Sequence, residues 1–460
     1  MKSDEIARYC FYLIVLTGFV LRAIFIGRES LWPDEALYMY ISQNLLSNPL
    51  DLHDQTGKLF FENPPLFTYM LSFLFRVLGI ISTQVARSFN TIIGSGTIVL
   101  VYFIGRHLYG RSVGLLSAAL LSLNPLHWWI STRILTDVPL TFFIYLSLFM
   151  LIRNKKGKFF IFSFASVATK YPAAPLFFVP ILNNVRLKKS PWLWMNLYLL
   201  GLALTIFFVA LNVKTEISWL DFLLASFRFP DLKQIYQETF YFLSSIVCFF
   251  FFIGLASALR KRDFSPLLIW VILFGTARFF LPWQAFRMSR YTLPLYPGVI
   301  IFAAYGGITS FSFLRKRLPK RTFFISMAFG SILLYTLFIF FLRGYAVTDI
   351  NSKTFVGFEY VKHFFKNESS DLAILTSSPR QVKYMAPHLS VYDLSGNLTP
   401  GQARTLIKEK LIDYILIDRW SPHQPKWAPQ YFLSDNRYHP VLQTKNLCIL
   451  AVRANLQKSN

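Results

Sequence analysis

Residues 9–40 read YCFYLIVLTGFVLRAIFIGRESLWPDEALYMY, an apolar run of membrane-span length followed closely by two adjacent carboxylates, Asp34 and Glu35. Pro33 suits the first position of a helix, and acidic residues there complement the helix dipole. Capping alone could therefore explain the pair. The alternative is that one carboxylate accepts a proton from a substrate while the other shapes the site, because neighbouring helical residues point about 100° apart.

The composition outside this stretch is that of a membrane protein. Hydrophobic residues make up 54% of the 460 residues, aromatic residues 18% and charged residues only 15%, and the mean hydropathy is +0.44. A soluble chain of this length is less apolar, so we predict a polytopic α-helical membrane protein. The net charge of +24 is interpreted by position along the chain, because cationic loops beside membrane spans indicate topology before they indicate nucleic acid. We expect no nucleic-acid partner.

Apolar runs predict about eleven transmembrane helices. Several are shorter than the roughly 20 residues needed to cross a bilayer, which predicts tilted helices or breaks at Pro172 and Pro175. The expected spans are 9–27, 88–105, 113–130, 138–152, 159–169, 172–184, 192–213, 241–259, 265–281, 291–311 and 323–342.

The strong basic clusters all fall on one side of the membrane if the N-terminus is cytoplasmic. They are Arg106 with Arg111; Arg153, Lys155, Lys156 and Lys158; Arg186, Lys188 and Lys189; Arg260–Arg262; and Arg315–Arg317 with Lys320 and Arg321. Cytoplasmic loops carry an excess of lysine and arginine, so this pattern supports the span count. An odd number of spans predicts an extracytoplasmic C-terminus in a multi-pass protein of the cell membrane.

One apolar segment, Pro64–Leu78, is not counted as a span because counting it would invert every later basic loop. We predict an interfacial helix there. Residues 28–87 then form one large outer loop. The first span could instead be a cleaved signal peptide, but no small-x-small cleavage site precedes Arg28, which favours a retained span.

The composition changes after Arg343. Residues 345–460 alternate apolar runs with helix-like stretches, which predicts a small soluble α/β domain on the outer side. We therefore expect two domains, a transmembrane catalytic module at 1–344 and an extracytoplasmic domain at 345–460. The three cysteines, Cys10, Cys248 and Cys448, provide no disulfide framework.

A second acidic position, Asp137, is expected in a short outer turn before the span at 138–152. It could serve the helix N-terminus, since Pro139 follows. A carboxylate at membrane level is costly unless it is paired or functional, which makes Asp137 a candidate catalytic residue beside Asp34 and Glu35. Glu62, just before Pro64, has the same two interpretations and is a candidate substrate-binding residue.

Outer cations form a complementary set, because they oppose the positive-inside trend. Arg287 and Arg290 lie in a short outer loop, and Lys170 lies near the outer end of its span. Each could extend to lipid head groups. For Arg290 we favour a role, because an arginine beside the bilayer can hold a lipid phosphate through two parallel hydrogen bonds.

The sequence leaves the use of a divalent metal open. Asp51, His53 and Asp54 offer oxygen and nitrogen ligands close together in the chain. A solvated acidic turn is the simpler interpretation. No cofactor is indicated with certainty.

These motifs in this order resemble the GT-C membrane glycosyltransferases related to protein O-mannosyltransferases and to the aminoarabinose transferases that modify lipid A. The resemblance covers roughly residues 9–311. It runs through Trp32–Glu35, Phe61–Pro65, Leu135–Pro139, Thr169–Tyr171 and Ser289–Pro297. One position departs from the pattern: relatives often carry lysine directly before the first proline of the second motif, where this chain has Asn63. Lys58 or Arg290 could provide the missing cation.

The resemblance implies transfer of one sugar from a polyprenyl (dolichyl or undecaprenyl) phosphate carrier to a hydroxyl acceptor on a protein, lipid or glycan. It implies that Asp34 is the catalytic base, that the other matched acids line the site, and that the matched basic residues, Lys170 and Arg290, lie near the donor phosphate. Lys58, Arg287 and Tyr291 are further candidate substrate-binding residues. Direct displacement with inversion at the anomeric carbon would follow. The alternative class is a multispan transporter or lipid-linked sugar flippase, which would also show many spans and intramembrane charge.

Overall fold

The computed structural model describes residues 3–60, 63–187, 232–280, 289–353, 356–394, 398–418, 421 and 424–452. The chain divides into two compact units. We call the first the helical unit; it comprises Met1–Ile26, Phe61–Met70 and Gln84–Val347. The second, here the mixed unit, comprises Gly27–Phe60, Leu71–Thr83 and Thr348–Asn460.

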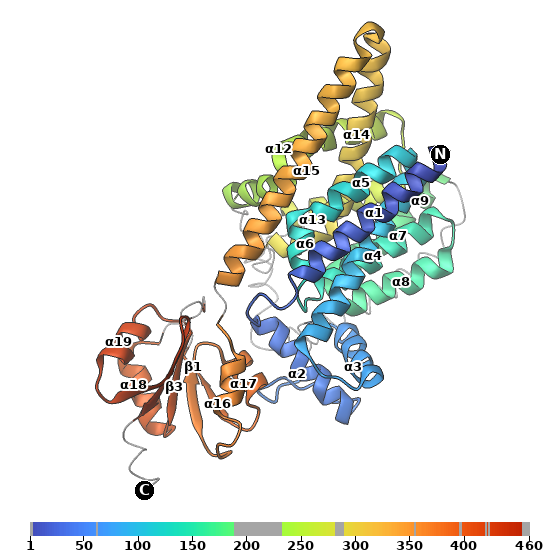
Figure 1. Cartoon of the computed structure of the whole chain (residues 1–460). Coiled ribbons are helices and arrows are strands. Elements are labelled where there is room, and N and C mark those ends of the chain that lie inside the picture. Colours follow the sequence, from blue (N-terminus) through green and yellow to red (C-terminus); the bar gives the residue numbers. More distant parts are fainter. Residues whose placement is uncertain are drawn as a thin grey trace. The chain divides into compact units, whose positions relative to one another are not determined.

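Helices make up the described part of the helical unit (Figure 1). In chain order they are α1 (Ser3–Ile24), α4 (Thr83–Tyr109), α5 (Arg111–Leu123), α6 (Pro125–Ser131), α7 (Asp137–Ile152), α8 (Lys156–Thr169), η1 (Tyr171–Phe177), α9 (Phe178–Leu187), α12 (Leu232–Arg260), α13 (Pro266–Phe280), η3 (Ser289–Leu295), α14 (Tyr296–Arg317), η4 (Pro319–Arg321) and α15 (Thr322–Lys353).

Five helices among the described residues are long and apolar enough to cross a membrane, and the bent pair α5–α6 would make a sixth. Shorter apolar helices are also present, among them α7 and the segment Tyr171–Asn183. The break expected at Pro172 and Pro175 is present as the 3-10 helix η1. The expected span at 192–213 lies outside the described residues, so the count of about eleven stays a prediction.

The bend between α5 and α6 measures 60° and occurs where Pro125 follows Asn124. A proline cannot continue the hydrogen-bond ladder, so carbonyls at the end of α5 need other donors. Arg22, fully buried on α1, provides them: its Nη1 donates to the Ser122 carbonyl at 2.9 Å, and its Nη2 lies 2.7 Å from Nδ1 of His127. A charged residue inside the first span thus stabilises the broken helix.

Helices α12 and α14 cross at two glycines. A Cβ added to Gly254 would overlap the Phe302 carbonyl, and one added to Gly306 would overlap the Phe250 carbonyl. Small residues let membrane helices approach to backbone contact. This crossing therefore depends on glycine at both positions.

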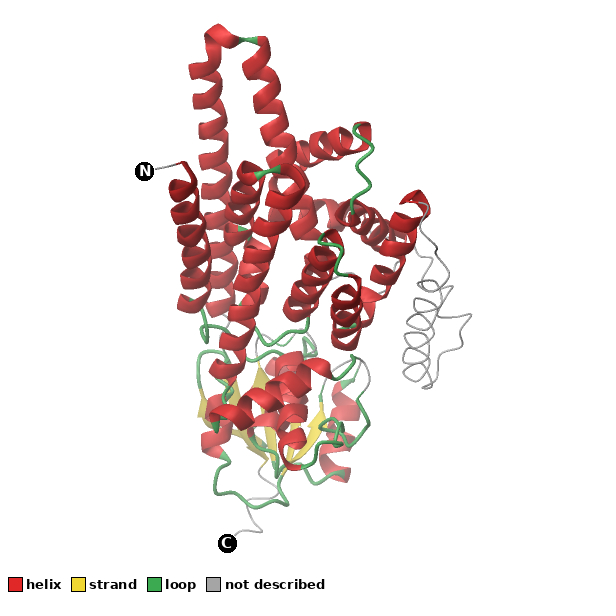
Figure 2. Cartoon of the chain, turned by 90° about the vertical axis from the view of Figure 1, so that its right-hand side faces the viewer, coloured by secondary structure: helices red, strands yellow, loops and turns green. Residues whose placement is uncertain are grey.

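The strands that the structure describes belong to one five-stranded sheet in the mixed unit (Figure 2). They are β1 (Ala373–Thr376), β2 (Ser390–Asp393), β3 (Tyr414–Asp418), β4 (Tyr438–Gln443) and β5 (Leu447–Val452), in the spatial order β2-β1-β3-β5-β4. Strand β1 pairs in parallel with β2 and β3, whereas β5 pairs antiparallel with β3 and β4. The accompanying helices are α16 (Glu359–Phe364), α17 (Pro379–Met385), α18 (Pro400–Glu409) and α19 (Ala428–Ser434).

The sheet has a hydrophobic core on each face, because neighbouring strand residues point to opposite sides. Ile374 belongs to one core and Leu375 to the other. The Ile374 core includes Leu31 and Ala36, which flank the start of α2 (Pro33–Ser47). Residues 27–60 thus belong to the same compact unit as the C-terminal sheet, and the expected boundary between residues 344 and 345 stays a prediction.

The apolar segment after Pro65 forms a single helix, α3 (Leu66–Leu78). Phe73 and Val77 on it are more than half exposed. An apolar face left uncovered by protein is typical of a helix that lies at a membrane surface. Its interfacial location stays a prediction.

Candidate functional site

A buried ion pair joins two of the expected site residues in the helical unit. Lys170 Nζ lies 2.7 Å from Oδ1 of Asp137, and the two side chains are 9% and 1% exposed, respectively. Asp137 begins α7, and Lys170 follows the end of α8 in an extended conformation. Among the described residues, Oδ2 of Asp137 has no hydrogen-bond partner. Burial of two charges is costly unless they are paired, so this contact ties the start of α7 to the end of α8.

Tyr291, in η3, contacts both Lys170 and a second cation, Arg290. Its ring centroid lies 4.2 Å from Nζ of Lys170 and 5.0 Å from the guanidinium carbon of Arg290. Nη2 of Arg290 also donates a hydrogen bond to the Tyr291 hydroxyl at 3.1 Å. Arg290 is only 8% exposed. We call Asp137, Lys170, Arg290 and Tyr291 the cationic cluster, because it holds two cations and one carboxylate.

Arg133 adds positive charge to this region. It is buried, its guanidinium carbon lies 5.1 Å from a ring of Trp129, and the helix before it, α6, packs against η3. Asn90 fixes the turn that follows: its amide donates to the carbonyls of Arg133 and Leu135, at 2.6 and 2.9 Å. The chain thus enters α7 along a set path, which places Asp137. Buried cations gathered in one place suit an anionic ligand.

The first acidic motif lies in the mixed unit and its two carboxylates differ. Glu35 is fully buried, and its Oε2 accepts a hydrogen bond from the Trp32 backbone N–H at 2.9 Å. A glutamate at the third helical position commonly caps the helix start in this way. Asp34 is 29% exposed, and its Oδ1 lies 3.6 Å from Nη1 of Arg380. Of the two carboxylates, Asp34 is therefore the one that solvent and substrate can reach.

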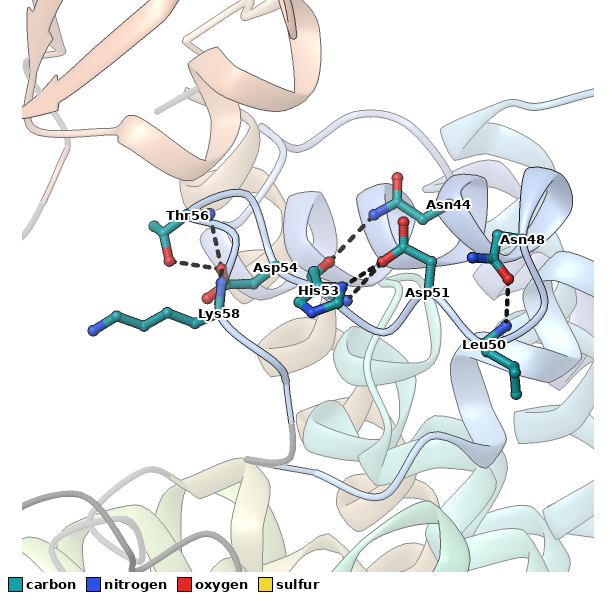
Figure 3. Close-up of polar contacts among 8 residues, drawn as sticks. All are labelled: Asn44, Asn48, Leu50, Asp51, His53, Asp54, Thr56 and Lys58. Atoms are coloured by element: carbon teal, nitrogen blue, oxygen red, sulfur yellow. Dashed lines mark hydrogen bonds and ion pairs between the residues drawn. The ribbon is translucent and has the colours of Figure 1, made fainter.

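The loop after α2 contains Lys58 and the three residues that could have been metal ligands, Asp51, His53 and Asp54 (Figure 3). Oδ1 of Asp51 lies 2.8 Å from Nδ1 of His53, and this hydrogen bond lowers the pKa of Asp51. Oδ1 of Asp54 accepts from the backbone and hydroxyl of Thr56 and from the Lys58 backbone. The exposed Lys58 side chain extends away from both carboxylates. In the part of the chain that the structure describes, no group of three acidic, histidine or cysteine residues could hold a metal ion.

The expected site residues thus fall into three groups. Asp137, Lys170, Arg290 and Tyr291 form one cluster in the helical unit, whereas Asp34, Glu35 and Lys58 belong to the mixed unit. Glu62 and Arg287 lie outside the described residues. Arg380 was not anticipated, because no local pattern links it to α2.

Comparison with known proteins gives both a family match and a fold. Residues 62–228 match the family model described as dolichyl-phosphate-mannose-protein mannosyltransferase. An uncharacterized protein of Aquifex aeolicus (strain VF5) is 25% identical over 320 residues, which cover 64% of this chain and 63% of that protein. The chain therefore spans less than two thirds of this relative's length.

Two solved structures resemble nearly the whole chain. ArnT from Cupriavidus metallidurans, bound to undecaprenyl phosphate, aligns with a TM-score of 0.62 at 12% identity over 96% of this chain and 97% of its own. The oligosaccharyltransferase AglB of Archaeoglobus fulgidus, in complex with an inhibitory peptide and a dolichol-phosphate, aligns with a TM-score of 0.63 at 12% identity. That alignment covers 90% of this chain and 69% of AglB. At these identities the likeness is one of fold.

Proposed function

We propose, from the premise that the chain is a membrane glycosyltransferase with the GT-C fold, that it moves a single sugar from a polyprenyl-phosphate carrier to a hydroxyl acceptor. The carrier is dolichyl or undecaprenyl phosphate, and the sugar is a hexose or pentose. The acceptor hydroxyl belongs to a protein, a lipid or a glycan on the extracytoplasmic face. The similar ArnT and AglB structures hold undecaprenyl phosphate and dolichol-phosphate, which supports a donor of this class.

The cationic cluster is the observation that carries this proposal. Lys170 and Arg290 are both more than nine-tenths buried, and both lie against the ring of Tyr291, so two buried cations meet at one position. A phosphate monoester or diester would balance this charge, and buried donors aimed at it would stabilise the negative charge that develops as the phosphate leaves. The planar guanidinium of Arg290 can donate hydrogen bonds to two phosphate oxygens at once, whereas the ammonium of Lys170 acts as a point charge.

Asp34 is the proposed general base. The acceptor oxygen attacks the anomeric carbon while its proton passes to the Asp34 carboxylate, and the bond from that carbon to the phosphate oxygen breaks with its electron pair. The products are the glycosylated acceptor with inverted configuration and the polyprenyl phosphate. Glu35 is proposed to hold the start of α2 in place through its bond to Trp32 rather than to exchange protons.

Donor binding tests the phosphate assignment. Arg290→Ala should weaken affinity for a polyprenyl-phosphate sugar by about 10–100-fold, the loss of a charge-assisted hydrogen-bond pair. Arg290→Lys should recover only part of it, because a point charge lacks the planar fork. Arg317→Ala, at an exposed arginine, is the matched control. Normal donor affinity of Arg290→Ala would place the phosphate elsewhere.

Turnover tests the base. Asp34→Asn keeps the size of the side chain but removes the proton acceptor, so transfer should fall by about 10²–10⁴-fold with donor binding intact. Glu35→Gln is the internal control, because the amide oxygen can still accept from Trp32. Near-normal turnover of Asp34→Asn would refute the assignment.

The donor itself can be identified directly. Mass spectrometry of lipids that co-purify with the protein should reveal a polyprenyl phosphate carrying one sugar, and reveal which sugar it is.

Cysteine labelling of intact cells tests which loops face the outside of the membrane. The basic clusters predict that a cysteine at Lys58 reacts from outside and one at Lys316 does not.

A further inference from the structure

A side chain from the C-terminal part of the mixed unit, that of Arg380, lies beside the proposed base. We propose that Arg380 is a positioning residue that holds the Asp34 carboxylate in the orientation needed to accept the proton. This inference rests on the proposed function, since it gives Arg380 its role through Asp34. The C-terminal sheet would then contribute to the reaction by supporting α17, the helix that carries Arg380.

The ion pair joins the starts of two helices. Asp34 is the second residue of α2, and Arg380 is the second residue of α17. Gln55 ties the same two turns together: its Nε2 donates to the Arg380 carbonyl at 2.8 Å and lies 3.5 Å from the carbonyl of Ala36. Hydrogen bonds from the Gln55 side chain to backbone carbonyls therefore hold the two helix starts at a set separation, and they involve neither charged side chain.

Apolar packing reinforces this arrangement. Ala36, two residues after Asp34, lies in the same hydrophobic core as Val382, two residues after Arg380. Both side chains are fully buried. Close-packed interiors resist displacement, so the Asp34 and Arg380 backbones move together. The side-chain contact is then a consequence of a rigid frame rather than a chance meeting of two surface residues.

The position of Arg380 is not explained by the needs of its own helix. A cation in the first turn of a helix opposes the helix dipole and is unfavourable there. Asp34 provides the compensating negative charge. The side chains of Arg380 and Asp34 are 36% and 29% exposed, and partly solvated pairs of this kind contribute little to stability. A role in orienting the Asp34 carboxylate explains the position of Arg380, which a contribution to folding stability does not explain.

Steady-state kinetics of the full-length protein test the inference. Arg380→Gln should lower kcat by about 10–100-fold, the scale that a misplaced catalytic group produces. The KM for the donor and the thermal unfolding midpoint should stay at the wild-type values. Arg380→Lys should restore part of kcat, because a 3.6 Å ion pair requires charge more than a planar fork. Arg404→Gln, at an exposed arginine of α18, should match the wild type.

A double-mutant comparison separates positioning from an independent role. Residues that act as a unit are not additive, so adding Arg380→Gln to Asp34→Asn should cause no further loss of kcat. Losses that multiply would overturn the inference. An Arg380→Gln protein that fails to fold would also overturn it, because the arginine would then support the fold.

The outcomes distinguish this inference from the function on which it rests. Near-normal turnover of Asp34→Asn removes the proposed base, and the Arg380 inference with it. An inactive Asp34→Asn together with a fully active Arg380→Gln removes only the role of Arg380.

Discussion

Replacing Lys170 with methionine tests the buried pair that anchors the cationic cluster. Methionine keeps most of the length of the side chain and removes its charge, which leaves Asp137 without its 2.7 Å partner at 1% exposure. Oδ2 of Asp137 has no partner among the described residues, so the variant would bury an uncompensated carboxylate. Breaking a buried pair in this way costs about 3–5 kcal/mol.

The second half of the test restores balance without charge. Replacing a buried pair by apolar residues of similar size is often neutral or stabilising, so Lys170→Met combined with Asp137→Leu should recover most of the lost stability. Donor affinity should not recover, because the cation proposed to meet the phosphate is absent. Stability and function are thereby separated within one pair.

Unfolding of the purified protein in detergent, followed by tryptophan fluorescence, measures the first effect, and calorimetric donor binding measures the second. Lys158→Met, at an exposed lysine of α8, the helix that Lys170 follows, is the matched control and should leave both unchanged. If Lys170→Met unfolds at the wild-type midpoint, the carboxylate is not buried as described. If the double variant is less stable than either single variant, the pair energetics are wrong.

Three further outcomes are expected. Gly254→Ala should destabilise the protein by about 1–3 kcal/mol, because the added methyl overlaps a carbonyl of α14, whereas Gly330→Ala meets open space and should be neutral; equal unfolding midpoints would contradict the close crossing. Glu35→Ala should cost about 1–2 kcal/mol through the lost cap, and an unchanged midpoint would argue against that hydrogen bond. Arg437 lowers the pKa of Asp435 to about 2, so the stability that this ion pair contributes is present above about pH 4 and is lost as the pH falls toward 2. In unfolding scans at decreasing pH, Arg437→Gln should therefore lose less stability than the wild type. Identical pH profiles of the two proteins would count against the ion pair.

Helix positions were largely predictable because apolar runs of this length have few alternatives. The expected span at 88–105 lies within α4, and that at 138–152 nearly coincides with α7. The resemblance to GT-C glycosyltransferases, stated from the order of the motifs, is confirmed by the family match and by the fold. What the apolar pattern did not predict is the bend at Asn124, because periodicity does not report how a chain continues past a proline.

The cluster was predictable as a set of residues but not as a geometry. Asp137 and Lys170 each stand out as charges at membrane level, whereas their contact depends on how α7 and α8 pack. Arg22 carries the same signal, a charge inside a span, and could have been singled out. Arg380 carries none: it is a surface-like arginine whose partner lies far away in the sequence.

The shared core of the mixed unit also bears on how the chain is made. Ser30 accepts a hydrogen bond from Val356, 326 positions later, and Leu31 and Ala36 share a core with residues of β1, β3 and β5, which are synthesised long after them. A nascent chain folds from its N-terminus onward, so the turn that carries Asp34 leaves the ribosome long before its supporting sheet exists. Until β5 has been made, this turn lacks its complete core, so a ribosome-bound intermediate with every preceding membrane helix in place would still lack the proposed base in its final position.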